Sequence, residues 1–271
     1  MIVDGHVHIT NDAEPARGWP PFSADHLIEL MDEELPFRSG KRIIDRAAVM
    51  PMLLPTQRAD LTFREQHQVV IDAVRRYPDR LVGTFMLNPH LGVEKGVAEL
   101  RRLVNEDGFR MVKLHPTAHA YWPKVRDFTD PVLAAAADLD IPVLIHTGDP
   151  PFSIPALMEP LAADHPATTV ILAHLGTQKT GYADDAINVA GHCDNIFLET
   201  GWGHQPRVAE AVLAIGADRM VFGSDCPVQD PFSQLRVIET LTRDGPLGVN
   251  LSATDMEAIM GDNMARLLRL S

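Results

Sequence analysis

The chain has 271 residues, and its 24 basic and 37 acidic side chains give a formal net charge of −13. Hydrophobic residues make up 45% of the sequence and charged residues 23%, which is ordinary for a globular protein and excludes a disordered chain. The acidic balance argues against a nucleic-acid partner, because binding to a phosphate backbone depends on clusters of Lys and Arg.

The sequence contains no apolar stretch near the roughly 20 residues that cross a bilayer, so we expect no membrane partner. Residues 1–6 lack the basic and apolar segments of a secretory signal. Cys193 and Cys226 are too few for a disulfide framework, and together these features favour a cytoplasmic protein. Histidine is the unusual component, with 12 residues against 3 Trp and 3 Tyr.

Short apolar runs rich in Val, Ile and Leu recur along the chain, as is typical of strands that are buried on both faces. The expected strands are Ile2–His8, Arg46–Leu53, Leu81–Leu87, Arg110–His115, Pro142–His146, Thr169–His174, Asn195–Thr200 and Met220–Ser224.

Helical patterns lie between these runs, and several begin at a recognisable signal. Pro131 and Pro206 are expected at the first helical position, Gly216 ends one helix, and Ser252 with Asp255 forms a capping pair. The expected helices include residues 62–77, 132–139, 207–215 and a terminal helix from 253 towards 268.

Alternation of strand and helix, repeated about eight times, predicts an α/β protein with a (β/α)8 barrel, a TIM barrel that forms one domain over residues 1–271. The alternative is an open, doubly wound sheet, in which a glycine-rich phosphate loop would follow the first strand, and the sequence has no such loop there. Residues 9–43 form a long, proline-containing insertion after the first strand, which we expect to be a cap or lid over a site.

Five histidines stand at the carboxyl ends of expected strands, and an aspartate follows the last strand. In a barrel these strand ends form the rim where catalytic residues gather. A single histidine at a strand end is more often simply hydrogen-bonded or solvated, but a group on one rim suits Zn²⁺ and similar metals. These residues are His6, His8, His115, His146, His174 and Asp225.

Six segments resemble motifs of a known family. They are 3–8 (VDGHVH), 112–116 (VKLHP), 142–148 (PVLIHTG), 172–176 (LAHLG), 222–227 (FGSDCP) and the closing segment 262–268. On these motifs, essentially the whole chain resembles the amidohydrolase superfamily of metal-dependent barrel enzymes. Within it, the chain looks most like the amidohydrolase-related branch that contains aminocarboxymuconate-semialdehyde decarboxylase and aromatic-acid decarboxylases.

The resemblance implies that His6, His8, His146 and Asp225 bind one divalent metal ion, with Zn²⁺ favoured and Mn²⁺ as the alternative. It also implies catalytic roles for His174, beside the metal-bound water, and for Asp225. Such an ion lowers the pKa of bound water towards about 7, and a neighbouring carboxylate can accept the proton.

Lys113 leaves open whether the site holds one metal ion or two, because binuclear members of the superfamily carry a carboxylated lysine at the end of the fourth strand. Here Lys113 precedes the rim residue His115 by two positions and therefore lies deeper in the barrel. We favour one metal ion, with Lys113 as a buried cation paired with Asp4 or Glu199. His115 is then expected to face the substrate.

Aromatic and basic residues in the expected loops are candidates for substrate binding. Trp19, Trp122 and Trp202 all fall in loops that converge over the rim, although such residues also pack caps or dimer contacts. Arg58 could pair with a substrate carboxylate or remain a solvated surface charge.

The favoured function is a metal-dependent hydrolase that acts on a small cyclic amide, ester or lactone carrying a carboxylate. The alternative is a metal-dependent, non-oxidative decarboxylase of a small aromatic or unsaturated acid. A metal-free lactonase and a non-catalytic barrel remain further alternatives. The resemblance also implies a homodimer.

Overall fold

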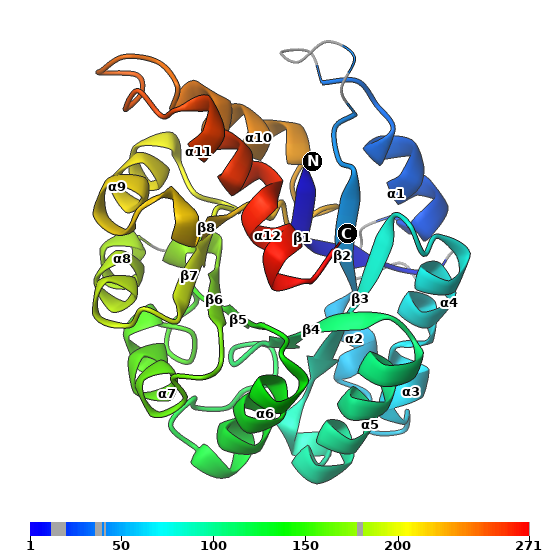
Figure 1. Ribbon diagram of the computed structural model, residues 1–271. Coiled ribbons are helices and arrows are strands. Elements are labelled where there is room, and N and C mark those ends of the chain that lie inside the picture. Colours follow the sequence, from blue (N-terminus) through cyan, green and yellow to red (C-terminus); the bar gives the residue numbers. More distant parts are fainter. Residues whose placement is uncertain (12–19, 36–39, 41, 178–180, 271) are drawn as a thin grey trace.

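Eight parallel strands form the centre of the molecule, as the computed structural model shows (Figure 1). The structure describes residues 1–11, 20–35, 40, 42–177 and 181–270. Each strand pairs with the next one along the chain. The strands are β1 (Val3–Ile9), β2 (Arg46–Pro51), β3 (Leu81–Leu87), β4 (Phe109–Leu114), β5 (Val143–His146), β6 (Val170–Ala173), β7 (Ile196–Glu199) and β8 (Met220–Val221).

The sheet closes on itself through backbone hydrogen bonds between β1 and the segment that follows β8. The amide of Gly5 donates to the carbonyl of Phe222 at 3.0 Å, and the amide of His8 donates to that of Cys226 at 2.7 Å. In the opposite direction, the Asp225 amide donates to the His6 carbonyl at 2.8 Å. The predicted (β/α)8 barrel of the α/β class is confirmed.

Helices surround this barrel (Figure 1), and none of those in the described residues is long and apolar enough to span a bilayer. They are α1 (Ala24–Met31), α2 (Leu53–Thr56), α3 (Phe63–Gln66), α4 (Gln68–Arg76), α5 (Val93–Glu106), α6 (Arg126–Leu139), α7 (Glu159–Asp164), α8 (Ala183–His192), α9 (Gln205–Ile215), α10 (Pro231–Thr240), α11 (Ala253–Glu257) and α12 (Asn263–Leu267). A π-helical turn, Ala258–Asp262, joins α11 to α12, and short 3-10 turns cover Pro89–Leu91, Pro155–Met158, His174–Gly176 and Ala217–Arg219.

The helix expected over residues 62–77 is broken at His67, which separates α3 from α4. The buried His67 ring lies with Nδ1 2.7 Å from the Phe63 carbonyl, while its Nε2 accepts from the Met86 amide of β3 at 2.8 Å. A tertiary hydrogen bond to the barrel therefore overrides the helical pattern at this position.

The helix start predicted at Pro131 is wrong. Helix α6 begins at Arg126 and carries Pro131 inside it. The Asp130 carboxylate is engaged elsewhere, with Nε of Arg126 at 2.9 Å and Nε2 of His165 at 3.0 Å, so it does not cap a helix. The starts predicted near Pro206 and at Ser252 are confirmed by α9 and α11.

The described part of the insertion after β1 contains α1, which packs on the outside of the barrel. Leu27 and Met31 of α1 are fully buried. Tyr77 donates a hydrogen bond to Asp25 at 2.6 Å, and Arg80 pairs with Asp32 at 2.9 Å. Helix α1 is thus the crossover helix between β1 and β2, and the expected cap or lid role stays a prediction.

Apolar side chains fill the amino end of the barrel. Met264 and Leu268, from α12 and its C-cap, pack with the inward side chains of the strands in one buried cluster. The strand members of this cluster are Val3, Ala48, Met50, Val82, Met86, Met111, Leu144, Ile171, Ala173, Phe197 and Val221. Polar groups that enter the barrel are consequently found towards its carboxyl end.

Asp4 and Ser224 join the two edges of the sheet that close the barrel. The Ser224 hydroxyl donates to Asp4 at 2.6 Å, and the Ser224 amide donates to the same carboxylate at 2.9 Å. Asp4 also accepts from the amide of His6, and the Ser224 hydroxyl accepts from the amide of Cys226, each at 3.0 Å. This network fixes the backbone on both sides of Asp225.

Replacing this hydroxyl should destabilise the fold. In Ser224→Ala, a buried Asp4 oxygen and the Cys226 amide each lose a hydrogen bond, so we expect the free energy of unfolding to fall by about 1–3 kcal/mol. Chemical denaturation monitored by circular dichroism measures this change. The matched control is Ser233→Ala, at an exposed position of α10, which should leave the free energy nearly unchanged. Equal stability of the two variants would contradict the role of this network.

Candidate metal centre and active site

The six predicted rim side chains line one small cavity at the carboxyl end of the barrel. The cavity has a volume of about 70 Å³. Its described lining consists of His6, His8, His115, His146, His174 and Asp225, together with Lys113 and the apolar residues Met52, Leu53 and Val228. Groups from β1, β4, β5, β6 and the segment after β8 therefore share one space.

Asp225 lies among the histidines of this cavity. Its Oδ1 is 3.4 Å from Nε2 of His6 and 3.3 Å from Nε2 of His8, and its Oδ2 accepts from Nε1 of Trp202 at 2.8 Å. Burial alone would raise the pKa of Asp225, but the neighbouring imidazoles of His8 and His174 and the hydrogen bond from Trp202 hold it below its ordinary value. The carboxylate is therefore ionised and able to bind a cation.

In three of the histidines, one ring nitrogen faces away from the cavity and contacts a carboxylate or a backbone carbonyl. We call it the outer nitrogen. An ionised carboxylate or a carbonyl can only accept a hydrogen bond. Such an acceptor keeps the hydrogen on the facing nitrogen and leaves the other ring nitrogen with its lone pair. The pairs are His6 Nδ1 with Glu199 Oε2 (3.4 Å), His8 Nδ1 with the Pro51 carbonyl (2.9 Å) and His146 Nε2 with Asp149 Oδ2 (2.9 Å). The lone pairs then lie on His6 Nε2, His8 Nε2 and His146 Nδ1.

Burial keeps the rings of His6 and His146 neutral. It lowers the pKa of His146 to about 4, although Asp149 opposes the shift, and it lowers the pKa of His6 well below the ordinary value, assisted by Lys113. Neutral imidazole is the form that binds a metal. The donors present, neutral imidazoles and an ionised carboxylate, therefore fit a divalent ion.

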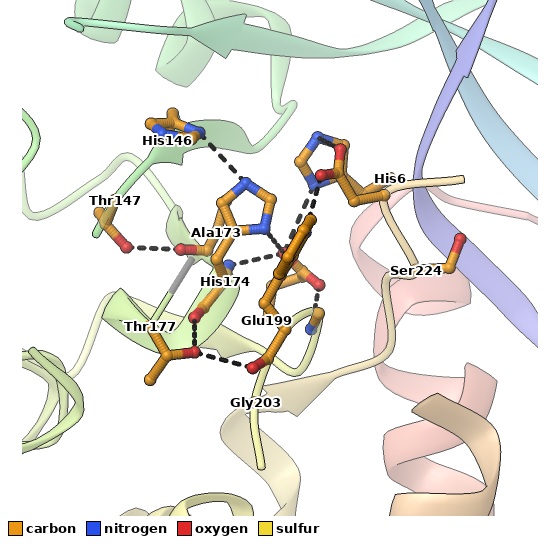
Figure 2. Close-up of polar contacts among 12 residues, drawn as sticks. His6, His146, Thr147, Ala173, His174, Thr177, Glu199, Gly203 and Ser224 are labelled. Atoms are coloured by element: carbon orange, nitrogen blue, oxygen red, sulfur yellow. Dashed lines mark hydrogen bonds and ion pairs between the residues drawn. The ribbon is translucent and has the colours of Figure 1, made fainter. Parts of the chain in front are cut away.

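His174 makes different hydrogen bonds from His6 and His146 (Figure 2). Its backbone is left-handed, with φ of 65°, and its Nε2 lies 3.1 Å from the lone-pair nitrogen of His146, to which it donates. Its Nδ1 has no hydrogen-bond partner among the described residues and lies 3.7 Å from Oε2 of Glu199.

The distances between possible donor atoms select a different set of residues from the four ligands that the resemblance implies. Single donor atoms of His6, His174 and Asp225, all buried, lie within 4.8 Å of one another. The site therefore contains a buried His/His/Asp group that could hold a metal ion. The hydrogen bonds separate His174 from His6, His8 and His146, because its outer nitrogen has no such acceptor.

Lys113 lies below this group and is completely buried. Its Nζ is 3.2 Å from Nε2 of His6, and in the described part of the chain this is its hydrogen-bond partner, in place of the expected Asp4 or Glu199. Burial lowers the pKa of Lys113 to about 8, while the charges of Asp225 and Glu199 oppose this shift.

His115 stands on the neighbouring strand end, stacked on His146 with ring centroids 3.7 Å apart. Its Nδ1 accepts from the amide of Ala118 at 3.1 Å, so the neutral ring carries its hydrogen on Nε2. Burial, followed by the nearby His146, lowers the pKa of His115 and keeps it neutral. The ring is thus a hydrogen-bond donor in the cavity, which suits the expected contact with a substrate.

The expected substrate-binding residues in the loops lie in different places. Trp202 donates to Asp225, so it orients a site carboxylate. Trp122 is 39% exposed, packs against Phe152 at 4.9 Å between ring centroids, and is not among the described residues of the small cavity. Trp19 lies outside the described residues.

Arg58 lines a second and larger cavity, of about 730 Å³, and pairs with Asp60 at 2.6 Å. Met52 belongs to the lining of both cavities, so they are neighbours. No arginine is found among the described residues that line the small cavity.

The sequence argument did not assign the outer partners of the histidines. The position of Glu199 could have been predicted from strand alternation. Glu199 ends β7 two residues after the inward-facing Phe197, so its side chain must also point into the barrel. Asp149 lies three residues after His146 in a turn, and nothing in the sequence shows that this turn brings the two side chains together.

Known proteins support the same architecture. A family model described as amidohydrolase matches residues 3–270. The chain is 24% identical to 2-keto-4-carboxy-3-hexenedioate hydratase of Sphingobium sp., over 83% of this chain and 83% of the hydratase.

Solved structures share the fold. A dihydroxybenzoic acid decarboxylase from Polaromonas sp., with bound manganese and the inhibitor 2-nitroresorcinol, has a TM-score of 0.72 at 18% identity, covering 99% of this chain and 97% of that one. A probable 2-pyrone-4,6-dicarboxylic acid hydrolase from Acinetobacter baumannii, with bound citric acid, has a TM-score of 0.70 at 15% identity, covering 99% of each chain. Because the family model spans nearly the whole sequence, the chain belongs to the amidohydrolase family.

Proposed function

We propose that the chain holds one divalent metal ion through His6, His8, His146 and Asp225. The hydrogen bonds to the outer nitrogens of the three histidines support this set, as does the ionised state of Asp225. Imidazole and carboxylate donors suit both Zn²⁺ and Mn²⁺, and the similar Polaromonas decarboxylase contains manganese. When bound, the ion would supply a positive charge that holds and polarises substrate oxygen atoms.

We infer that the substrate is a small carboxylic acid. The observation that carries this inference is Lys113, which is the one lysine or arginine among the described residues that line the small cavity. A substrate carboxylate in this cavity would lie near the positive charge of Lys113, in addition to the charges of Asp225 and Glu199 that already act on this lysine. The names of the similar hydratase, decarboxylase and hydrolase each contain a carboxylic acid.

We propose decarboxylation as the reaction, in preference to the hydrolysis that the sequence first favours. The apolar side chains of Met52, Leu53 and Val228 form part of the wall of a cavity of only about 70 Å³. Such a wall removes water from a bound carboxylate, and loss of CO2 then removes a charge that is poorly solvated. The likeness to the decarboxylase supports the same choice.

His174 is the proposed proton donor. Its Nε2 carries the hydrogen and faces the ligand nitrogen of His146, on the side of the metal centre. Burial lowers the pKa of His174 well below its ordinary value, so the ring would take up its second proton together with the anionic substrate. That proton then moves from Nε2 to the substrate carbon that bears the carboxylate. The bond between that carbon and the carboxylate then breaks, its electron pair restores the π-system of the substrate, and CO2 leaves. His115 would donate from Nε2 to a substrate oxygen.

Hydrolysis is the second candidate, because the chain also shares its fold with the hydrolase of a pyrone dicarboxylic acid. In that case His174 would stabilise negative charge on the substrate oxygen, while Asp225 would accept a proton from water. The two candidates use the same residues and differ in the bond that breaks.

Substitutions should separate the metal ligands from the proton donor. We expect Asp225→Asn and His6→Ala to lose most of the bound metal, because each removes a donor atom from the set. His174→Asn should keep the metal and lose turnover, and Asn also tolerates the left-handed backbone at this position. Elemental analysis after loading with Zn²⁺ or Mn²⁺ measures metal content, and circular dichroism checks the fold. Loss of metal from His174→Asn would make His174 a ligand, and full metal content in Asp225→Asn would contradict the proposed set.

The reaction can be identified from its products in deuterated water. We expect the metal-loaded protein to release CO2 from a hydroxybenzoic acid in a panel of acids and to leave deuterium on the carbon that lost it. Mass spectrometry and NMR of the product measure both, with His174→Asn as the inactive control. Ring opening of a pyrone dicarboxylic acid without CO2 release would establish hydrolysis and contradict the proposal.

A further inference from the structure

Glu199, at the end of β7, contacts His6 of β1 and His174, which directly follows β6 (Figure 2). Its Oε2 lies 3.4 Å from Nδ1 of His6, accepts from the backbone amide of His174 at 2.8 Å, and is 3.7 Å from Nδ1 of His174. Its Oε1 accepts from the amide of Gly201. The side chain is completely buried, so its two oxygens are reserved for these groups.

Two glycines leave the space in which this carboxylate lies. A Cβ atom at Gly223 would stand 2.7 Å from Oε1 and 2.8 Å from Cδ of Glu199, and one at Gly201 would also collide with Oε1. The backbone therefore approaches the Glu199 side chain from two loops without a side chain between them. This close fit fixes the carboxylate in one position.

We propose that Glu199 is a positioning residue that sets the tautomer of His6 for metal binding and holds His174 beside the metal centre. This inference rests on the proposed metal site. Glu199 is not itself among the proposed ligands or the reacting groups, so it acts through the two histidines.

The argument for His6 comes from both of its ring nitrogens. Glu199 offers an acceptor to Nδ1, while the Lys113 ammonium group offers hydrogens to Nε2 at 3.2 Å. Both contacts favour the tautomer with hydrogen on Nδ1 and the lone pair on Nε2. That lone pair faces Asp225, the second proposed ligand, at 3.4 Å. Carboxylates that accept from the outer nitrogen of a metal-binding histidine act in this way in many metal sites.

The argument for His174 comes from its backbone. Its left-handed conformation is unfavourable for a residue with a side chain, and the hydrogen bond from its amide to Glu199 stabilises it. The same Oε2 atom lies 3.7 Å from Nδ1 of His174, so the carboxylate faces the ring as well as the backbone amide of this residue. One carboxylate thus aligns a metal ligand with the proposed proton donor.

The test is Glu199→Gln, which preserves the size of the side chain. Gln has one acceptor oxygen where Glu has two, so its NH2 group must face either the Gly201 amide or the pair of His6 and His174. We expect part of His6 to shift to the tautomer with hydrogen on Nε2, and the dissociation constant for Zn²⁺ to rise about 10–100-fold. Imidazole nitrogen shifts in the ¹⁵N-labelled, metal-free protein report the tautomer, and chelator competition reports the affinity.

The neighbouring Thr200→Val is the matched control. Thr200 is buried, and its hydroxyl has no hydrogen-bond partner among the described residues, so its loss should change neither measurement. Gly223→Ala is the second variant, because it displaces the unchanged Glu199 carboxylate, and it should reproduce the tautomer shift of Glu199→Gln. If Glu199→Gln does not fold, Gly223→Ala alone tests whether Glu199 sets the tautomer of His6.

An unchanged His6 tautomer and an unchanged Zn²⁺ affinity in both Glu199→Gln and Gly223→Ala would overturn the inference. The tautomer is measured without metal, so it tests Glu199 even if the reaction proves to be hydrolysis. Conversely, a tautomer shift in a protein that releases no CO2 would support the role of Glu199 and contradict the proposed decarboxylation.

Discussion

Closure of eight parallel strands into one barrel is the constraint on which the site depends. Because all strands run in the same direction, their carboxyl ends meet at one rim, and alternate side chains must point inwards. The chain turns sharply at this rim, where His174, Trp202 and Asp225 all adopt left-handed backbones with φ between 61° and 65°. The strand ends and the turns directly after them thereby bring the polar groups of distant segments into one space.

The interior of this rim is highly charged for a buried region, and its charges compensate one another. Asp225 and Glu199 are carboxylates, Lys113 is a cation, and all are enclosed. Burial raises the pKa of Glu199, while backbone hydrogen bonds from His174 and Gly201 and the charge of Lys113 oppose this shift and favour the ionised carboxylate. Burying such groups is costly unless each is paired, and a divalent ion in their midst would supply the largest compensating charge.

The sequence was sufficient to predict the barrel, its eight strands and the convergence of the rim histidines, because strand period and strand direction determine them. It did not predict the break at His67 or the early start of α6, since both depend on tertiary contacts. Trp202 was expected to face a substrate, yet it donates to Asp225. The outer partners of the histidines depend on loop conformation, so the sequence offered only a partial signal for Glu199 and none for Asp149.

The central claim is that three histidines and Asp225 hold one divalent ion while His174 stands beside it. A crystal structure of the metal-loaded protein, with anomalous scattering at the absorption edge of the metal, tests this most directly. The account predicts one anomalous peak, with His6 Nε2, His8 Nε2, His146 Nδ1 and an Asp225 oxygen each about 2.0–2.2 Å away if the ion is Zn²⁺. A peak coordinated by His174 in place of His146, or a second peak at Lys113, would contradict it.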